Sequence, residues 1–595
     1  MKSMKTGAAF SDHIITESFH HSHSMSGGKR SMRGFLLPVF LIVFAGILIV
    51  KLFLLQVMQG DYYRLLSDNN RIKTTTIHAP RGIIFDRNNM PLVFNMPGFR
   101  QSDLKNAGQK KTTFLDEKEG IARLAAGDKN LEIDSLRQYP YKDALSHVVG
   151  YVGEISDSQL KLPQFQSYRG GDIIGKMGIE QTYEDKLKGQ DGKTLSEVDA
   201  SGKIIRKLGQ ADPIPGQNIQ ITIDSKLQQA AFTAMKDVKK GAAIVTTPDG
   251  QILSLVSKPS FDPNLFTLGQ NYKTGTTSGY PDVASILTDG ENQPLLNRAI
   301  SGTYPPGSTF KLVVASSGLH NKIIDQNYQV EDSGILKVGA FSFSNWYYSQ
   351  YGRTEGSVDV VKGIKRSNDI FFYELAAKIG VDQISKTASE FGLGNVLGID
   401  LFGEEKGIVP TPEWKEKAIG EQWYLGDTYH YGIGQGYLLT TPLQVNGWTQ
   451  AIANDGTLYQ PHLLLDEKPS IKNQNFLDPK TISLVREGMI EACDTGGVAW
   501  PLFQFKVKNE KLQIDGKDIL PAASSSAAFR HVVVACKTGT AEHGGPTTEP
   551  HAWLTAFAPA YHPQIVVTVL VESSGEGSNV AAPIAKKILE EWFGR

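Results

Sequence analysis

A long apolar run near the N-terminus is the first feature of the chain's hydrophobic pattern. Residues 34–55 are almost wholly apolar and are interrupted only by Lys51. At 1.5 Å per residue, a helix of this length crosses a hydrocarbon core of about 30 Å. The run exceeds the apolar core of a signal peptide, about 7–15 residues, and no small-residue cleavage site follows it. We therefore expect an uncleaved membrane anchor rather than a cleaved signal.

Charge on the flank of this run orients it in the membrane. The run is preceded by Lys29, Arg30 and Arg33, and no acidic residue lies between residues 18 and 33. Basic residues next to a membrane helix stay in the cytoplasm. We expect a single-pass protein of the cytoplasmic membrane, with its N-terminus inside and its main body in the periplasm or outside the cell.

Beyond the anchor, residues 57 to about 230 mix short alternating runs with charged turns, which is typical of a spacer domain. The segment from Arg81 to Asn88 predicts a strand followed by a turn. Residues 101–134 are polar, Lys-rich and poor in large apolar residues, so an exposed arm or a small, weakly packed subdomain is expected there. Alternation over residues 219–223 and a helix opening at Ser225 indicate where a second domain begins.

Strand signals at both ends of this second domain predict its architecture. Residues 242–247 and 252–257, joined by a Pro-Asp-Gly turn, form a strong hairpin signal. Strand-like runs recur at 531–540, 551–557 and 564–572, and an amphipathic helix is predicted at 580–593. The residues between are mostly helical in pattern, so we expect an α+β fold: an antiparallel sheet built from both ends of the domain, beside a helical insertion. The expected organisation is a tail at 1–33, a membrane helix at 34–56, a spacer at 57–230 and a second domain at 231–595.

Composition removes several classes of function. Lys and Arg number 61 and Asp and Glu 62, and no basic stripe is visible, so nucleic acid is excluded as a partner. The two cysteines, Cys493 and Cys536, make neither a disulfide framework nor a zinc knuckle. We expect burial alone to hold the fold, with Cys536 as a small buried side chain that points away from its neighbour Lys537.

Ser308 and Lys311 are the first candidates for chemistry. The segment from Tyr304 to Val314 is a Pro/Gly turn that leads into an apolar helix, so Ser308 lies where free N–H groups favour negative charge. Lys311 follows at i+3, on the same face, where an amine can serve as the base for a hydroxyl nucleophile. The Ser-x-x-Lys pattern is weak by itself, because it recurs at Ser26, Ser102 and Ser158. A Ser in this position is more often a plain helix cap.

Two further segments carry candidate residues. Ser367-Asn368-Asp369 precedes an apolar helix, and alone it would be interpreted as a cap. Lys537-Thr538-Gly539-Thr540 ends an apolar strand, where a cation, hydroxyls and N–H groups can meet an anionic ligand; the alternative is a solvated strand end. A second Lys-Thr-Gly-Thr begins at Lys273, but no apolar strand precedes it, so we interpret it as a coincidence.

The order of these motifs gives them their specificity. Ser-x-x-Lys, then Ser-x-Asn or Ser-x-Asp, then Lys-Thr-Gly on a late strand is the signature of penicillin-recognising enzymes. The exported chain resembles class B penicillin-binding proteins over nearly its whole length, and most of all the elongation-type penicillin-binding protein 2. Further matching residues are Arg81 to Arg87, Gly175 to Gly192 with Glu180, Tyr183 and Glu184, Tyr304 to Lys311, Gly432 to Tyr437, Thr441-Pro442 and His551 to Trp553.

The resemblance implies a fold and an activity. Residues 57–230 would be a pedestal resembling the family's dimerisation domain, and 231–595 a transpeptidase domain with a five-stranded antiparallel sheet and an all-helical subdomain. The chain would be a serine D-Ala-D-Ala transpeptidase or carboxypeptidase that cross-links peptidoglycan stem peptides, with no cofactor. β-Lactams would be covalent inhibitors, and a multi-span glycosyltransferase in the membrane would be a partner.

The resemblance also implies a role for each candidate residue. Ser308 would be the acylated nucleophile and Lys311 its base. Ser367 and Lys537 would relay the proton, while Asp369 orients the cluster. The substrate carboxylate would be held by Thr538 and Thr540 on either side of Gly539, and the N–H groups of Ser308 and Thr540 would form the oxyanion hole.

Three departures from the family pattern affect these expectations. The spacer from Phe99 to Pro140 is shorter than in typical relatives, and an extra segment at about 500–529, with alternating Phe503, Phe505 and Val507, suggests a hairpin beside the cleft. Some relatives carry zinc near the second motif, but the corresponding positions here are Asn345, Tyr351 and Asn368, so no metal is expected.

Other functions of the same fold remain open at this point. A division-specific transpeptidase would share every motif. A β-lactamase would need an efficient deacylating water, a β-lactam sensor would need a larger signalling part than one span and a short tail, and an inactive scaffold would differ only in its cleft. The lifetime of the acyl-enzyme separates a transpeptidase from a β-lactamase.

Overall fold

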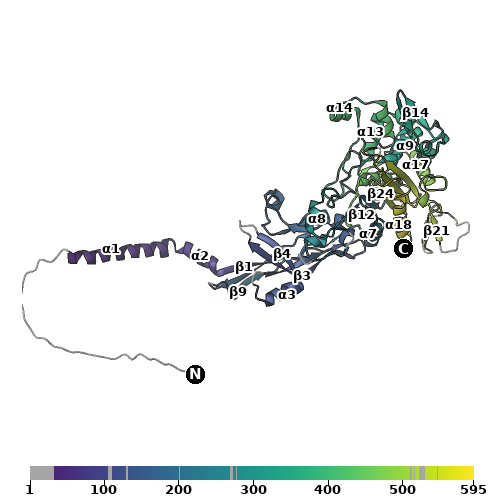
Figure 1. Ribbon diagram of the computed structural model, residues 1–595. Coiled ribbons are helices and arrows are strands. Elements are labelled where there is room, and N and C mark those ends of the chain that lie inside the picture. The colour runs from purple at the N-terminus through teal and green to yellow at the C-terminus, as the bar shows by residue number, and fades with distance from the viewer. Residues whose placement is uncertain are drawn as a thin grey trace, which may run out of the picture. The chain divides into compact units, whose positions relative to one another are not determined.

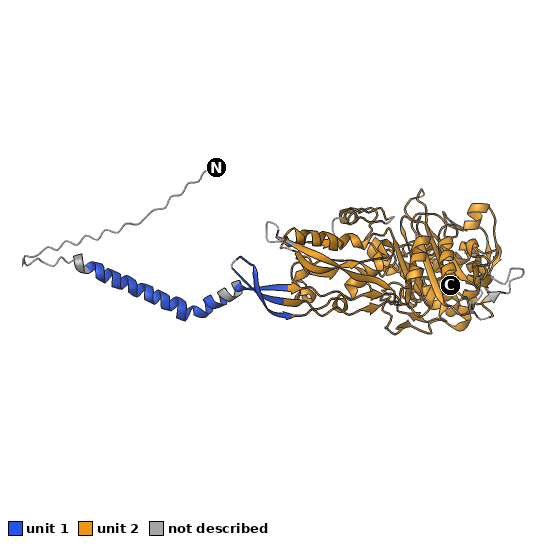
Figure 2. Cartoon of the chain, turned by 90° about the horizontal axis from the view of Figure 1, so that it is seen from below, with its two compact units in different colours: residues 1–75, 194–210 blue, residues 76–193, 211–595 orange. Residues whose placement is uncertain are grey.

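The computed structural model describes residues 33–595 except 105–109, 129–130, 200, 269–271, 276–277, 510–511, 513, 515, 521–528 and 546. The chain divides into two compact units, shown in different colours in Figure 2. The first consists of residues 1–75 and 194–210, and the second of residues 76–193 and 211–595. Ser308, Lys311 and the residues of the second and third motifs all belong to the second unit.

The first unit contains the predicted membrane helix. Helix α1, Arg33–Phe53, continues through a π turn at Leu54–Met58, and residues 36–58 are long and apolar enough to cross a membrane. The apolar side chains of this stretch are exposed, as expected for a segment whose solvent is lipid. Helix α2, Gly60–Arg71, follows. A three-stranded sheet has the order β1-β8-β9, with β1 at Ile72–Ile77, β8 at Gly192–Val198 and β9 at Ile204–Ala211.

The N-terminal part of the second unit is built on strand β3, Pro91–Leu104. It pairs with β2 (Ile84–Phe85), β4 (Lys110–Asp116) and β5 (Leu131–Gln138), and helix α3 is Glu117–Ala125. The predicted turn after β2 exists: Asp86 Oδ1 accepts hydrogen bonds from the N–H groups of Asn88 and Met90, both at 2.8 Å. The expected exposed arm at 101–134 is wrong, because its described residues form two strands and a helix against β3. The many Lys and Thr residues of the 101–134 segment obscured the strand pattern in its sequence.

A buried ion-pair network joins distant parts of this region. Arg81 contacts Glu180 at 2.9 Å and Glu184 at 2.8 Å, and Arg137 contacts Glu180 at 2.6 Å. Arg81, Glu180 and Glu184 are three of the residues on which the family resemblance rests. Because the charges are buried together, removing one partner would leave the others uncompensated, and this explains why these residues occur as a set.

The core of the second unit is a five-stranded antiparallel sheet of order β12-β11-β24-β23-β22 (Figure 1). Its strands are β11 (Gly241–Thr246), β12 (Ile252–Lys258), β22 (Ala535–Ala541), β23 (His551–Ala558) and β24 (Ile565–Val571). The sheet is therefore assembled from both ends of the domain, as predicted. Helices α7 (Ser225–Ala234) and α18 (Ala581–Phe593) cover one face, and α16 (Pro442–Ala453) covers the other. The predicted boundary at residue 230 stays a prediction.

The expected helical insertion lies between β12 and β22. Its helices are α8 (Val283–Thr288), α9 (Lys311–His320), α10 (Trp346–Tyr351), α11 (Val360–Arg366), α12 (Asp369–Ile379), α13 (Val381–Glu390), α14 (Pro412–Ile419), α15 (Leu425–Gly432), α16 and α17 (Pro479–Ala492). Helix α9 is buried along nearly its whole length. It packs against α12, α13 and α17, so the turn before it has a fixed position.

Two further predictions about the end of the domain need correction. The expected single strand at 531–540 is two: β21, Phe529–Val532, and β22, separated at residues 533–534. The extra segment forms more than a hairpin: β20 at Ile519–Leu520 pairs antiparallel with β21, and β19 at Lys506–Lys508 extends this pair to a three-stranded sheet of order β19-β21-β20. The continuous apolar run across β21 and β22 concealed the point at which the chain changes sheets.

The expectation that burial alone holds the fold is also wrong. Cys493 and Cys536 form a disulfide, with their Cα atoms 5.8 Å apart. Cys493 caps the C-terminus of α17, which packs against β22, the strand that carries Cys536. The spacing of 43 residues in sequence gave no sign of this pairing. Cys536 does point away from Lys537, into the core beneath α18, as strand alternation predicts.

Candidate active site

Ser308 lies in a 3₁₀ turn, Gly307–Phe310, that leads directly into α9. Gly307 has φ +53°, and a Cβ there would lie 2.7 Å from the Thr540 carbonyl oxygen. Its N–H donates to the Gly434 carbonyl at 2.9 Å. Only glycine permits this conformation so close to β22. The sequence Pro-Pro-Gly-Ser therefore places the serine between the third motif and the 432–436 loop.

Lys311 lies three residues after Ser308, at the end of the same turn. In a 3₁₀ turn the side chains at i and i+3 lie almost directly above each other, so both project from one face. The Lys311 side chain is fully buried, and its Nζ contacts Asp369 Oδ1 at 2.7 Å and the Ser367 carbonyl oxygen at 2.8 Å. Burial lowers the pKa of Lys311, and the charge of Asp369 partly offsets this.

The second motif connects two helices. Ser367 ends α11 with φ +53°, a left-handed conformation that is uncommon for serine, and the chain then enters α12. The helix cap is Asn368, whose side chain accepts a hydrogen bond from the Phe371 N–H at 2.9 Å. The segment therefore does cap the helix, through Asn368 and not through Asp369. Asp369 is the first helical residue, and its carboxylate is free to bind Lys311.

A buried carboxylate that the sequence did not suggest supports this arrangement. Asp332 Oδ2 accepts hydrogen bonds from the side-chain amides of Asn345 and Asn368 and from the Glu355 N–H, each at 2.9 Å. Asn345 in turn accepts from the Asp369 N–H at 3.2 Å. The next residue, Trp346, donates its N–H to Asp369 Oδ2 at 3.0 Å, which leaves Oδ1 for Lys311. The Asp369 carboxylate is thus oriented from two sides.

The positions where relatives carry zinc do not fit the metal. Zinc takes thiolate, imidazole or carboxylate ligands. Here the amides of Asn345 and Asn368 both turn their NH₂ groups to Asp332, and Tyr351 is exposed. Within the described part of the chain, no cluster of three or more His, Cys, Asp and Glu side chains could hold an ion. At these positions next to the second motif, the Asn345 and Asn368 side chains therefore form hydrogen bonds with Asp332 instead of binding a metal.

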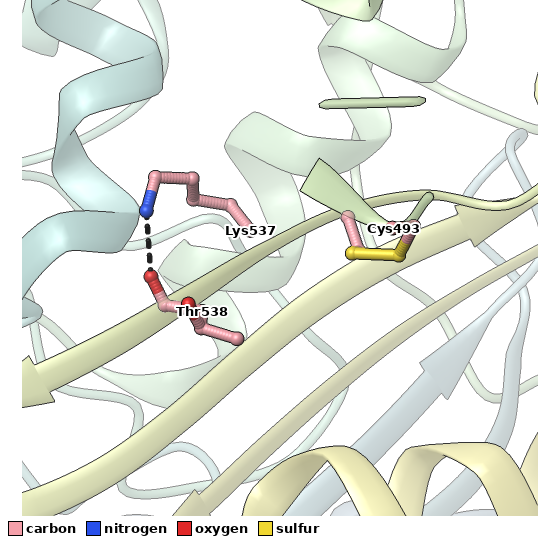
Figure 3. The surroundings of a disulfide bond; sticks show 4 residues. Cys493, Lys537 and Thr538 are labelled. Carbon is pink, nitrogen blue, oxygen red and sulfur yellow. Dashed lines mark hydrogen bonds between the residues drawn. A yellow bond between two sulfur atoms is a disulfide. The ribbon is translucent and has the colours of Figure 1, made fainter. Parts of the chain in front are cut away.

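The third motif lies on the edge strand β22. Lys537 is fully buried, and its Nζ donates to Ser367 Oγ and to the Thr538 carbonyl, both at 2.9 Å. Figure 3 shows the contact with Thr538. Burial holds the pKa of Lys537 well below its usual value, and the nearby Lys311 lowers it further, while Asp369 acts in the opposite direction. The Ser367 hydroxyl therefore lies between two amines, since Lys311 Nζ is 3.3 Å away.

The remaining candidates fall outside this cluster. Ser158 is exposed and contacts Ser156, Ser102 lies within β3, and Ser26 lies outside the described residues. Lys273, which begins the second Lys-Thr-Gly-Thr segment, is exposed in a loop without strand structure. It lies beside a groove of about 770 Å³ lined by residues of β3 and α3. Thr276, the last residue of that segment, is outside the described residues. Ser308 is partly exposed, and among the described residues none forms a hydrogen bond with its hydroxyl.

Comparison with known proteins covers most of the chain. A family model described as the penicillin binding protein transpeptidase domain matches residues 241–590, and one for the penicillin-binding protein dimerisation domain matches 129–221. The peptidoglycan D,D-transpeptidase MrdA of Escherichia coli is 33% identical, over 92% of each chain. Penicillin-binding protein 2 of Helicobacter pylori, solved in complex with MreC, superposes with a TM-score of 0.71 at 27% identity, over 88% of this chain and 98% of the other. A chain of a peptidoglycan synthase complex that coordinates polymerization and crosslinking superposes with a TM-score of 0.69 at 28% identity, over 94% and 98%.

Proposed function

The chain belongs to the class B penicillin-binding proteins, within the penicillin-binding protein 2 group of peptidoglycan D,D-transpeptidases, and we propose that Ser308 is its acylated nucleophile. The observation that carries this proposal is the hydrogen-bonded cluster beside that serine. Two buried lysines from separate motifs, Lys311 and Lys537, meet at one hydroxyl, that of Ser367. A merely structural serine at a helix start needs no such surroundings.

Lys311 acts as the base in its neutral form. A neutral amine has two N–H donors and one lone pair. The donors of Lys311 are directed to Asp369 Oδ1 and the Ser367 carbonyl, so its lone pair is left for a hydroxyl. The Ser367 hydroxyl lies 3.3 Å away, and we assign to the same lone pair the proton that Ser308 loses on attack. Ser308 Oγ then bonds to the carbonyl carbon of the penultimate D-Ala, the peptide C–N bond breaks, and the proton passes to the departing D-Ala amine.

Ser367 and Lys537 complete the route of the proton. The cluster contains two amines but only one carboxylate, so burial favours a state in which the amines together hold a single extra proton. The Ser367 hydroxyl joins the two nitrogens and lets this proton move between them. The two lysines therefore titrate as a coupled pair.

Thr538 and Thr540 provide the contacts for substrate. The two residues lie on β22, whose unpaired edge faces the turn of Ser308, and Thr540 is exposed. We assign their hydroxyls to the terminal carboxylate of the stem peptide. The N–H groups of Ser308 and Thr540 form the oxyanion hole, because Gly307 brings its turn close to Thr540. Loss of such a donor typically slows a reaction by about 10²–10³.

We further propose that the enzyme serves cell elongation. Its single membrane helix would anchor it in the cytoplasmic membrane, with the N-terminus in the cytoplasm and the catalytic domain in the periplasm or outside the cell. The basic flank of the apolar helix supports this orientation. Asp369 supports the elongation type, because most penicillin-binding proteins end the second motif in Asn and the elongation type resembles this chain in having Asp. A multi-span glycosyltransferase is the proposed partner. The relatives solved with MreC and in a peptidoglycan synthase complex support a function within an assembly.

Mass spectrometry of the full chain after reaction with a labelled penicillin tests the nucleophile. We expect one penicillin per chain, bound in the peptide that contains Ser308, and no labelling of Ser308→Ala. Ser158→Ala is the matched control and should be labelled like the natural chain. Label that persists in Ser308→Ala would refute the assignment. A short-lived acyl-enzyme that releases hydrolysed penicillin rapidly would favour a β-lactamase instead.

A further inference from the structure

The Cys493–Cys536 disulfide lies at the junction of the second and third motifs. Cys536 is the residue immediately before Lys537 on β22. Figure 3 draws Cys493 and its disulfide together with Lys537 and Thr538. Both cysteines are buried in the core that α18 covers. The disulfide is not part of the motif pattern, and no step of the proposed reaction uses its sulfur atoms.

Strand β22 needs a restraint beyond its sheet. It is the last strand in the order β12-β11-β24-β23-β22, so only β23 pairs with it. The opposite edge of β22 faces the turn of Ser308, where substrate must enter. An edge strand with hydrogen bonds on one side alone is easier to displace than an internal one.

The other end of the disulfide is fixed to the second motif. Glu491 accepts a hydrogen bond from Lys365 at 2.8 Å, and the Gly496 carbonyl accepts one from Arg366 at 2.9 Å. Lys365 and Arg366 are the two residues immediately before Ser367. Helix α17 also packs closely along α11, because Gly488 has no side chain: a Cβ there would lie 2.7 Å from the Cβ of Ile364.

We infer that the Cys493–Cys536 disulfide is a positioning element of the active site, which holds Lys537 at hydrogen-bonding distance from Ser367. The end of α17 binds the residues before Ser367 on one side and the residue before Lys537 on the other. The disulfide and α17 thus connect Lys537 to Ser367 by a second route, in addition to the 2.9 Å hydrogen bond between Lys537 Nζ and Ser367 Oγ. This inference rests on the proposed function, in which that hydrogen bond carries the proton.

Formation of the bond requires an oxidant. The two thiols lose one hydrogen each, and a disulfide-carrying oxidoreductase accepts both hydrogens and becomes a dithiol. Such oxidants belong to the exported side of the membrane, where the proposed orientation places both cysteines. The enzyme would therefore reach its full rate only after export.

The test compares acylation by labelled penicillin in the natural full chain and in Cys493→Ala/Cys536→Ala. We expect acylation of the double variant to be roughly tenfold to a hundredfold slower, since a displacement of about 1 Å can have such an effect. The acid limb of its pH profile should move to higher pH, because a loosened strand admits water to Lys537 and raises its pKa. Cys493→Ala alone, which keeps the side chain in β22, should behave in the same way.

Two controls separate positioning from stability. Phe593→Leu weakens the packing of α18 on the same core, so its thermal midpoint should fall while its acylation rate and pH profile stay unchanged. Reduction of the natural chain with a dithiol should slow acylation but should not affect the double variant. Two free thiols in the oxidised natural chain, or a double variant with the natural rate and pH profile, would overturn the inference. If the natural chain is not labelled at Ser308, the proposed function itself fails.

Discussion

Lys273 and Lys537 both begin a Lys-Thr-Gly-Thr segment, but their surroundings differ in every respect that matters for catalysis. Lys273 is exposed in a loop, and its neighbours Tyr272 and Thr274 bind Asp262. Lys537 is fully buried on β22 and contacts Ser367. The same motif lies in a loop over its described residues 273–275 and forms one wall of a candidate active site at residues 537–540.

The difference shows what gives the motif its chemistry. Burial beside Lys311 lowers the pKa of Lys537 strongly, so a lysine that would stay protonated in water can exchange a proton here. The apolar residues directly before it, Ala535 and Cys536, begin β22 and so place the motif within the central sheet, where Lys537 is buried. A short motif therefore has predictive value only together with the element that precedes it.

Replacement of each lysine by alanine tests this comparison most strongly. We expect Lys537→Ala to slow acylation by labelled penicillin by about 10²–10⁴, the usual contribution of a positioned proton-transfer group. Lys273→Ala is the matched control and should retain the natural rate, because an exposed loop lysine contacts none of the three motifs. Equal losses in both variants would mean that the wrong copy has been assigned to the site.

Replacement of Asp369 by asparagine sharpens the comparison, because it changes the charge beside Lys537 without moving the strand. The Asp369 carboxylate raises the pKa of both Lys311 and Lys537 against the effect of burial. Without this charge the neutral amines persist to lower pH, so the acid limb of the acylation profile should move to lower pH. The maximal rate should fall roughly tenfold to a hundredfold, since Lys311 loses the partner that orients it.

The fold should persist in Asp369→Asn, because the helix cap is Asn368 and not Asp369. Circular dichroism and the thermal midpoint check this point. A folded variant with an unchanged pH profile would contradict the electrostatic role of the carboxylate. It would also remove the reason for treating the two lysines as a coupled pair.

The sequence was sufficient to predict features that depend on local pattern. The hairpin signal at residues 242–257 and the strand-like runs within 551–572 predicted strands of the central sheet, and the Pro-Gly-Ser turn before an apolar helix predicted the position of Ser308. It was insufficient where a contact joins distant residues with no pattern of their own. The disulfide pairs cysteines 43 residues apart, and Asp332 meets Asn368 across 36. Such contacts are set by helix packing and cannot be seen in spacing.

Asp332→Asn should have the smallest effect of the three, because it acts on the cluster only through Asn345 and Asn368. The new amide cannot accept all the hydrogen bonds that Asp332 now accepts, and its own NH₂ would face another donor. We expect a loss of roughly 1–3 kcal/mol in the free energy of unfolding. We also expect acylation to be roughly tenfold slower, because Asn345 and Trp346 would no longer hold Asp369 in place.

A second carboxylate provides the matched control for this change. Asp359 caps α11 by accepting a hydrogen bond from the Lys362 N–H at 2.8 Å, and asparagine is an equally good cap. Asp359→Asn should therefore keep both stability and acylation rate. If Asp332→Asn lowers the thermal midpoint but leaves the rate and pH profile of acylation unchanged, Asp332 is structural only, and the orientation of Asp369 comes from its own helix. Slower acylation with an altered pH profile in Asp332→Asn alone would show that the hydrogen-bond network beside the second motif reaches the two lysines.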